Sequence, residues 1–387
     1  MSNKISVLVG LKNALEYTKT FYSSARALYP ETEIVFVSYN STDGTHEWLD
    51  SLTDDNLIYF YSPEEKTFSD TFNKCAELAT REYVVFAHND MIFAPLFLEN
   101  IEKIVAEDRI VIYSVIEPPI FAGDERVGKI IRDFGGDTES VNIPEIYSFV
   151  ENYRSGLSLT SVPSKLGSFF LCLHKGTLLG IGGLDPLFNP MFCEDDDLLL
   201  RLKLLGLHIC ISLDALCYHF VSKTSRFSDE YKLRTEMIEN QSRRNFIRKW
   251  RFAIDSAQQL TYDIGIVLAN CTYDMLAKTE PWGGSIYTDF DASGYIIDEQ
   301  PKTAIDLHSK IKKPGQLQPH DVVVYVDCRQ LNKRSLRKIS RLNEQIGKKI
   351  STRNNFFMRL IPGLKGIKIQ VNKVAHHECT LIKRTMI

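Results

Sequence analysis

The chain has 387 residues, 44% hydrophobic and 25% charged, which is typical of a globular protein of two or three domains. Charged or polar side chains interrupt its most apolar region, 198–218, and exclude a membrane-spanning helix there: Arg201, Lys203, His208 and Asp214. The N-terminus lacks a signal-peptide pattern, and the eight cysteines form no Cys-x-x-Cys pair, so we expect a cytoplasmic protein with reduced thiols.

Short apolar runs alternate with helical segments in the first quarter of the chain. Strands are predicted at 5–9, 33–37, 57–61 and 83–87, and a helix near 69–79 precedes the last of them. This alternation favours a mostly parallel sheet that is covered by helices. Because ligands of such sheets bind beyond the carboxyl ends of the strands, we expect the chemistry in the loops that follow these runs.

The middle of the chain is more varied. Residues 116–165 are rich in proline and glycine, and we expect an irregular segment that serves as a binding loop or lid. Further on, the pattern predicts a mostly buried helix at 195–205 and a charged helix at 230–250.

A second domain is predicted after a boundary near 250–262. Within 263–387 we expect strands at 264–269 and 322–326 and an amphipathic helix at 335–350, which together indicate a smaller α+β domain. The helix would turn Ile339, Leu342, Ile346 and Ile350 inward and Arg337, Lys338, Arg341, Lys348 and Lys349 outward.

The C-terminal part of the chain differs in charge from the rest. Residues 301–387 hold 19 Lys+Arg against 5 Asp+Glu, a balance of +14, whereas residues 1–300 hold 27 against 44, a balance of −17. Such asymmetry is typical of a segment that binds phosphate, in nucleic acid or at a lipid surface, although a solvated basic face that only promotes solubility would show it as well.

Three elements have side chains suited to chemistry. The strand at 83–87 leads into His88-Asn89-Asp90, where a carboxylate could hold a hard divalent cation or simply form a turn. Four consecutive acids, Glu194–Asp197, begin an apolar helix, where one could act as general base. His219 lies in an apolar, strand-like run that would suit a buried core residue equally well.

The order of these motifs resembles the family 2 glycosyltransferases of GT-A fold, over about residues 4–250. The matching segments are 5–13, 34–45 with Ser41-Thr42-Asp43-Gly44-Thr45, Asn73, His88-Asn89-Asp90, Gly182–Phe188, Glu194–Leu198 with Arg201-Leu202, His219 and Phe246–Trp250. The resemblance implies a Rossmann-like catalytic domain at 1–250 and leaves 263–387 as a basic domain that could bind the acceptor.

The resemblance also implies roles for particular residues. Asp90 and His219 would bind Mn²⁺ or Mg²⁺, and Asp195 would be the general base. The implied cofactor-binding set is Gly10, Leu11, Asn13, Ser38, Asp43, Asn73, His88, Asp185 and Glu194. Two residues depart from the family pattern. His88 replaces an aspartate, which favours a metal site with fewer or softer ligands. Ser38 replaces the aspartate that normally binds the nucleotide.

We therefore predict an inverting, metal-dependent glycosyltransferase with a nucleotide-sugar donor, in the first place a UDP-sugar. The acceptor would be a hydroxyl, either on a modified base in DNA held by the basic domain or on a surface glycan or lipid-linked phosphate. A non-catalytic GT-A-like binding module is the alternative from a different class, although the intact Glu194–Asp197 run argues against it. A nucleotidyltransferase would need a basic, glycine-rich loop after the first strand, which Gly10-Leu11-Lys12-Asn13 does not supply.

Overall fold

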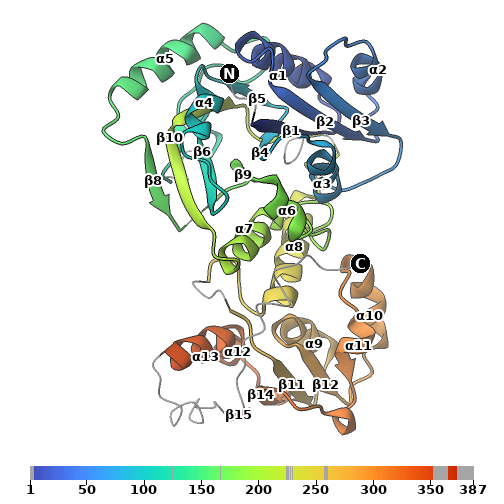
Figure 1. Cartoon of the computed structure of the whole chain (residues 1–387). Helices are drawn as coiled ribbons and strands as arrows, with labels where there is room; N and C mark the ends of the chain where they lie inside the picture. Colours follow the sequence, from blue (N-terminus) through green and yellow to red (C-terminus); the bar gives the residue numbers. More distant parts are fainter. Residues whose placement is uncertain are drawn as a thin grey trace. The chain divides into compact units, whose positions relative to one another are not determined.

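The computed structural model describes residues 4–121, 123, 126–165, 167–223, 226, 228, 230–256, 260–351 and 365–372, with only the backbone of 349–351. The chain divides into two compact units, Met1–Glu236 and Met237–Ile387 (Figure 1). The second unit begins near the start of helix α8 (Thr235–Trp250), ahead of the boundary expected at 250–262.

A ten-stranded sheet forms the centre of the first unit. Its first part has the order β3-β2-β1-β4, with all four strands parallel, and agrees with the four strands expected from the sequence. In β1, β2 and β4, the side chains on both faces of the sheet are buried, which explains the continuous apolar runs of these three strands. The bounds are β1 (Ile5–Leu11), β2 (Glu33–Tyr39), β3 (Leu57–Ser62) and β4 (Tyr83–His88).

The second part of this sheet brings distant segments together. Strand β9 (Leu171–His174) runs antiparallel between β4 and β6 (Arg109–Glu117), and β10 (His208–His219) pairs parallel with β6. Short β5 (Met91–Phe93) lies antiparallel to the end of β10. Two further strands pair at the edges: β7 (Lys129–Ile131) with β6 and β8 (Ser161–Ser164) with β10. The carboxyl ends of β4, β6 and β10 therefore lie near one another.

Helices cover the sheet of the first unit. Helix α3 packs on β1 and β2, and its capping box between Thr67 and Asp70 fixes its first turn. Helix α1 contacts β5, and α4 contacts β10. The helices of this unit are α1 (Leu15–Leu28), α2 (Thr45–Asp50), α3 (Phe68–Leu78), α4 (Phe97–Glu102), α5 (Ile143–Ser155), α6 (Lys175–Gly180) and α7 (Glu194–Leu204).

The expectation of an irregular segment at 116–165 holds only in part. The segment contains the end of β6, the short helix η1 (Pro119–Phe121), strands β7 and β8, and the thirteen-residue helix α5. Asn142 caps α5 and Pro144 lies in its first turn, a place where proline favours a helix instead of breaking it. Buried Ile146 and Val150 of α5 then pack in one cluster with Leu216 and Tyr218 of β10.

The second unit has a five-stranded sheet in the order β13-β12-β11-β14-β15, and only β15 is antiparallel. The expected strands at 264–269 and 322–326 are present, but the expected α+β class is wrong, because helices connect parallel strands in an α/β arrangement. The strands are β11 (Ile264–Ala269), β12 (Ser285–Thr288), β13 (Ile311–Lys312), β14 (Val322–Asp327) and β15 (Ile367–Val371). Besides α8, the helices are α9 (Tyr273–Thr279), α10 (Ser293–Glu299), α11 (Leu307–Lys310), α12 (Lys333–Ser340) and α13 (Leu342–Ser351).

The helix expected at 335–350 is two helices, α12 and α13, which meet at Arg341. Its apolar face is confirmed, since Ile339, Leu342 and Ile346 are buried in the core of the second unit. The side chains of Lys349 and Ile350 lie outside the described residues, as do residues 352–364 and 373–387 of the basic tail.

Two further expectations can be compared with the structure. No helix among the described residues is long and apolar enough to cross a membrane. Within the same part of the chain the seven cysteines are free thiols, and Cys379 lies outside it.

Candidate functional site

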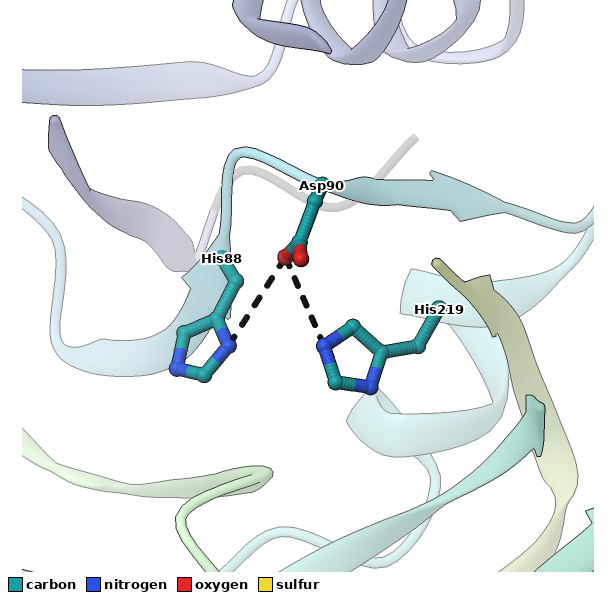
Figure 2. A group of neighbouring side chains, drawn as sticks. All are labelled: His88, Asp90 and His219. Carbon is teal, nitrogen blue, oxygen red and sulfur yellow. Dashed lines mark ion pairs between the residues drawn. The ribbon is translucent and has the colours of Figure 1, made fainter. Parts of the chain in front are cut away.

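Three side chains converge where β4 and β10 end. His88 is the last residue of β4, Asp90 follows in the turn to β5, and His219 is the last residue of β10, paired with Met91. Figure 2 shows both imidazole rings beside the Asp90 carboxylate. Asp90 Oδ1 lies 3.4 Å from His219 Nε2 and 3.9 Å from His88 Nδ1. One ligand atom from each residue lies within 4.8 Å of the other two, a spacing suited to a single metal ion.

Three polar atoms of this group are buried without a hydrogen-bond partner among the described residues, and two of them, Asp90 Oδ1 and His219 Nε2, face each other. Asp90 is 1% exposed and His219 5% exposed. Among the described residues, no hydrogen-bond partner is found for Asp90 Oδ1, His219 Nε2 or His88 Nε2. Because a buried polar atom normally has a partner, such unpaired atoms indicate a missing ligand. Two imidazoles and a carboxylate fit a divalent transition metal.

The charges of the three residues depend on one another. Burial lowers the pKa of His88 to about 4, which keeps this imidazole neutral. Burial would also lower the pKa of His219, but the carboxylates of Asp90 and Glu117 outweigh it and raise that pKa to about 9. For Asp90, burial acts to raise the pKa, yet His219 and His88 hold it well below its usual range. The site thus favours an ionised Asp90.

A cavity of about 290 Å³ opens beside this group, and both imidazoles line it. Aromatic side chains form much of its wall: Phe68, Phe72, Phe169 and Phe170. The rings of Phe169 and His88 are 5.0 Å apart between centroids, as are those of Phe170 and His219. These contacts restrict the orientation of both imidazoles and make part of the cavity apolar.

The four acids at the start of α7 have different environments. Glu194 is buried and lines the cavity, and its Oε2 has no hydrogen-bond partner among the described residues. Asp195 is half-buried and Asp196 exposed. Asp197 is fully buried and forms an ion pair with Arg201 at 2.8 Å, and Arg201 also donates to the carbonyl oxygens of 181 and 183. The fourth acid therefore anchors the helix, and the first faces the cavity.

Comparison with known proteins identifies this unit. Residues 6–156 match the family model described as glycosyl transferase family 2. Over these residues the first unit is similar to the family 2 glycosyltransferases, and we refer to this unit as the glycosyltransferase domain. Its parallel strands and the site at their carboxyl ends agree with the GT-A fold expected from the sequence. No curated protein matches the chain significantly.

The glycosyltransferase domain is also similar to solved structures. They include GalNAc-T7 with UDP, GalNAc and Mn²⁺ (12% identity over 56% of this chain and 43% of that chain, TM-score 0.42). A second is the mannosyltransferase PcManGT from Pyrobaculum calidifontis with GDP-Man and Mn²⁺ (17% identity, 64% and 63%, TM-score 0.41). A third is S. aureus TarS 1-349 with UDP (15% identity, 63% and 72%, TM-score 0.41). The chain spans less than two thirds of the length of the first two.

Some of the residues expected to bind the nucleotide line the cavity of the glycosyltransferase domain, and others hold its loops. Gly10 and Leu11 line the cavity, and a Cβ on Gly10 would lie 2.8 Å from the Phe72 ring, so the position requires glycine. Asn13 and Asp43 instead connect the loops after β1 and β2. Asn13 Oδ1 accepts from the Thr42 amide at 2.8 Å, and Asp43 Oδ2 accepts from the Leu15 amide at 2.8 Å.

Ser38, Asn73 and Asp185 are likewise engaged in local hydrogen bonds. The Ser38 hydroxyl is fully buried and lies 2.9 Å from His46 Nε2. Asn73 exchanges two hydrogen bonds with the backbone of Leu184. Asp185, also fully buried, accepts from the Leu187 amide at 3.0 Å. These three side chains shape the loops around the cavity, and they are not among its lining residues.

Sequence reasoning missed several charged residues at the cavity, and two of them, Glu117 and Lys129, contact the candidate metal site or each other. Glu117 ends β6, and one of its carboxylate oxygens lies 2.8 Å from His219 Nδ1. Lys129 of β7 lies 2.9 Å from the other oxygen. A carboxylate directly after the apolar run 110–116 is the same signal that singled out Asp90, so Glu117 could have been found in this way.

Proposed function

We propose that the glycosyltransferase domain is metal-dependent and inverting, and that it transfers a sugar from a nucleotide-sugar donor, in the first place a UDP-sugar, to an acceptor hydroxyl. The observation that carries the proposal is the group of His88, Asp90 and His219. One ligand atom from each residue lies within 4.8 Å of the others, Asp90 Oδ1 and His219 Nε2 have no hydrogen-bond partner among the described residues, and the group adjoins a cavity that Glu194 also lines.

The donor set favours Mn²⁺ over Mg²⁺. Mg²⁺ prefers oxygen ligands, whereas two imidazole nitrogens and one carboxylate suit a softer divalent ion. His88, Asp90 and His219 would hold the cation, and His88 is thereby proposed as a ligand in place of the usual aspartate. A bound divalent cation supplies Lewis-acid stabilisation of the charge that develops on the departing diphosphate.

We propose that Glu194 and Asp195 have different protonation states and therefore different roles. Burial raises the pKa of both carboxyls, and the neighbouring Asp195 charge raises that of Glu194 further, well above its usual range. One of two such neighbours retains its proton while the other ionises. Asp195 is then the carboxylate that takes the proton of the acceptor hydroxyl, and protonated Glu194 donates a hydrogen bond at the cavity wall.

Inversion follows from the placement of a single base. If Asp195 activates the acceptor on the face of the sugar opposite the departing diphosphate, one displacement occurs and the anomeric configuration inverts. The apolar wall formed by Phe169 and Phe170 would limit water at the reacting centre and so disfavour hydrolysis of the donor.

The test is a panel of nucleotide sugars, each assayed for sugar release with Mn²⁺, with Mg²⁺ and with EDTA. We expect release from one donor, highest with Mn²⁺ and lost in EDTA and in Asp90→Ala. Glu151→Gln, on the exposed face of α5, is the matched control and should behave as wild type. Release that persists in EDTA and in Asp90→Ala would refute metal dependence.

For the acceptor, we propose duplex DNA bound through the second unit. Exposed cations lie along α12 and at its junction with α13: Lys333, Arg334, Arg337 and Arg341. Arg341 and Lys348 partly offset this charge by pairing with Glu344. A surface that neutralises several phosphates should bind DNA with a log–log salt slope of about −0.9 per phosphate contacted.

The acceptor proposal is tested by measuring DNA affinity at several salt concentrations. The triple change of Arg334, Arg337 and Arg341 to alanine should make the slope shallower. A control triple change of the exposed Lys278, Lys302 and Lys313 should not. Absence of DNA binding at low salt together with binding to anionic vesicles would replace DNA by a lipid-linked acceptor.

A further inference from the structure

A buried carboxylate lies directly behind His219. Strands β6 and β10 are parallel, and Tyr218 is in register with Ile116. The residues that follow them, His219 and Glu117, therefore lie side by side. Glu117 Oε1 lies 2.8 Å from His219 Nδ1, and both side chains are 6% exposed. The imidazole therefore has one nitrogen engaged by Glu117 and the other, Nε2, directed toward Asp90.

A buried lysine holds the same carboxylate from its other side. Lys129 Nζ lies 2.9 Å from Glu117 Oε2, and the lysine side chain is 2% exposed. Strand β7 sets this contact, because its pairing with β6 places Lys129 opposite Val115. An ionised carboxylate in a buried place needs such a partner, since an unpaired buried charge is strongly destabilising.

These contacts determine which nitrogen of His219 is available to a ligand. An ionised carboxylate can only accept, so Nδ1 keeps its proton in the hydrogen bond to Glu117, and Nε2 is the nitrogen whose proton a cation can replace. Glu117 itself cannot serve as a ligand in this arrangement, because one of its oxygens faces His219 and the other faces Lys129. It lies on the opposite side of the imidazole from Asp90.

We propose that Glu117 and Lys129 are positioning residues of the metal centre, which fix the tautomer and orientation of His219 so that Nε2 points at the ion. The inference rests on the metal site of the proposed function and adds two residues that touch neither the ion nor the reacting atoms. Outer partners of this kind typically change metal affinity by about 10–100-fold when they are removed.

The test measures Mn²⁺ binding directly, by the paramagnetic resonance signal of the free ion, without donor or acceptor. We expect Glu117→Ala to weaken binding about 10–100-fold. Glu117→Gln should recover part of this loss, because its amide oxygen still accepts from Nδ1. Lys129→Met should lie between Glu117→Ala and wild type. Glu151→Gln is the matched control, and thermal unfolding of each variant verifies that it is folded.

A second measurement distinguishes positioning from general support of the fold. In the Zn²⁺-loaded protein, nitrogen-15 shifts of the histidine rings report the tautomer. We expect a protonated Nδ1 and a metal-bound Nε2 for His219 in wild type, and loss of this single state in Glu117→Ala. If Asp90→Ala abolishes Mn²⁺ binding but Glu117→Ala binds Mn²⁺ as tightly as wild type and keeps the His219 tautomer, the metal site stands and the inference is overturned. If wild type and Asp90→Ala bind Mn²⁺ equally, the metal site of the proposed function fails, and the inference fails with it.

Discussion

Each unit of the chain contains a buried cluster of charged side chains, and the two clusters differ in how their atoms are paired. In the second unit, Glu280 is fully buried, and both of its carboxylate oxygens have cationic partners. Lys310 lies 2.7 Å from one oxygen, and Arg248 lies 3.0 Å from the other, which also accepts from the Tyr295 hydroxyl. In the first unit, Asp90 and His219 are also buried, but Asp90 Oδ1 and His219 Nε2 lie 3.4 Å apart and have no hydrogen-bond partner within the described residues.

The difference shows that buried charge alone does not indicate a functional site. The Glu280 cluster resembles a ligand site in its density of charge, yet its carboxylate is fully satisfied by protein groups, which is the usual state of a buried ion. The group around Asp90 leaves three buried atoms without a hydrogen-bond partner among the described residues, and two of them, Asp90 Oδ1 and His219 Nε2, face each other. We therefore assign a structural role to the Glu280 cluster and a ligand-binding role to the group of His88, Asp90 and His219.

The largest expected effect is on the stability of the second unit. Glu280→Ala leaves Arg248 and Lys310 buried without their common anion, and we expect it to reduce the free energy of unfolding by about 3–5 kcal/mol. Asp90→Ala should cost less than half of this amount, because it removes a long ion pair with His219 and one hydrogen bond from the Lys223 amide, while Glu117 still pairs with His219. Denaturant unfolding measures both.

The control for this prediction is Asp274→Ala, which breaks the exposed pair of Asp274 with Lys278 on α9. An exposed pair of this kind contributes about 0.5 kcal/mol or less. If Glu280→Ala is no more destabilising than this control, the contrast between the two clusters is wrong.

Stability should also depend on pH through Glu280. Burial acts to raise its pKa, but Lys310 and Arg248 outweigh burial and lower it to about 2, from 4.5 in the unfolded chain. A depressed folded-state pKa stabilises the protein above pH 4.5, and this contribution is lost as the pH falls toward 2. The difference in unfolding free energy between wild type and Glu280→Gln should therefore shrink over this window, by at most about 3 kcal/mol. A difference that stays constant from pH 6 to pH 2 would contradict the pairing.

In the first unit, the acids of α7 should differ in their effect on catalysis. Asp195→Asn cannot accept a proton, so we expect kcat to fall about 100-fold or more while nucleotide affinity is nearly unchanged. Glu194→Gln retains the hydrogen-bonding pattern of the protonated acid and should keep kcat within about threefold. Steady-state kinetics of the two variants test the assignment. The reverse order of effects would make Glu194 the base.

Much of the first unit could be predicted because its signals are local. The apolar runs of β1, β2 and β4 are continuous, and the loop after β4 carries Asp90. The pairing of β10 with β5 and β6 is not local, since it joins His219 to Met91 and brings Glu117 beside it. Only the folded sheet shows that these residues meet. The sequence therefore indicated the candidate metal ligands one by one, without their distances or the carboxylate behind His219.

The misjudged regions have specific physical reasons. Pro144 suggested an irregular chain, although proline in the first turn of α5 favours a helix. In the second unit, β12 and β13 have four and two residues, too short for a clear periodic pattern, so the parallel sheet was not recognised. The nucleotide contacts that the resemblance implies for Ser38 and Asn73 stay predictions, and in this structure the two side chains form hydrogen bonds with His46 and Leu184.

The central claim is that His88, Asp90 and His219 together hold the metal ion of the glycosyltransferase domain. The most direct measurement is anomalous X-ray diffraction at the manganese edge from crystals of the full chain grown with Mn²⁺ and UDP. We expect one strong peak within bonding distance of Asp90 Oδ1 and His219 Nε2 and of a nitrogen of His88, and no such peak in crystals of Asp90→Ala. A manganese peak elsewhere in the domain, with these three side chains unbound, would contradict the account.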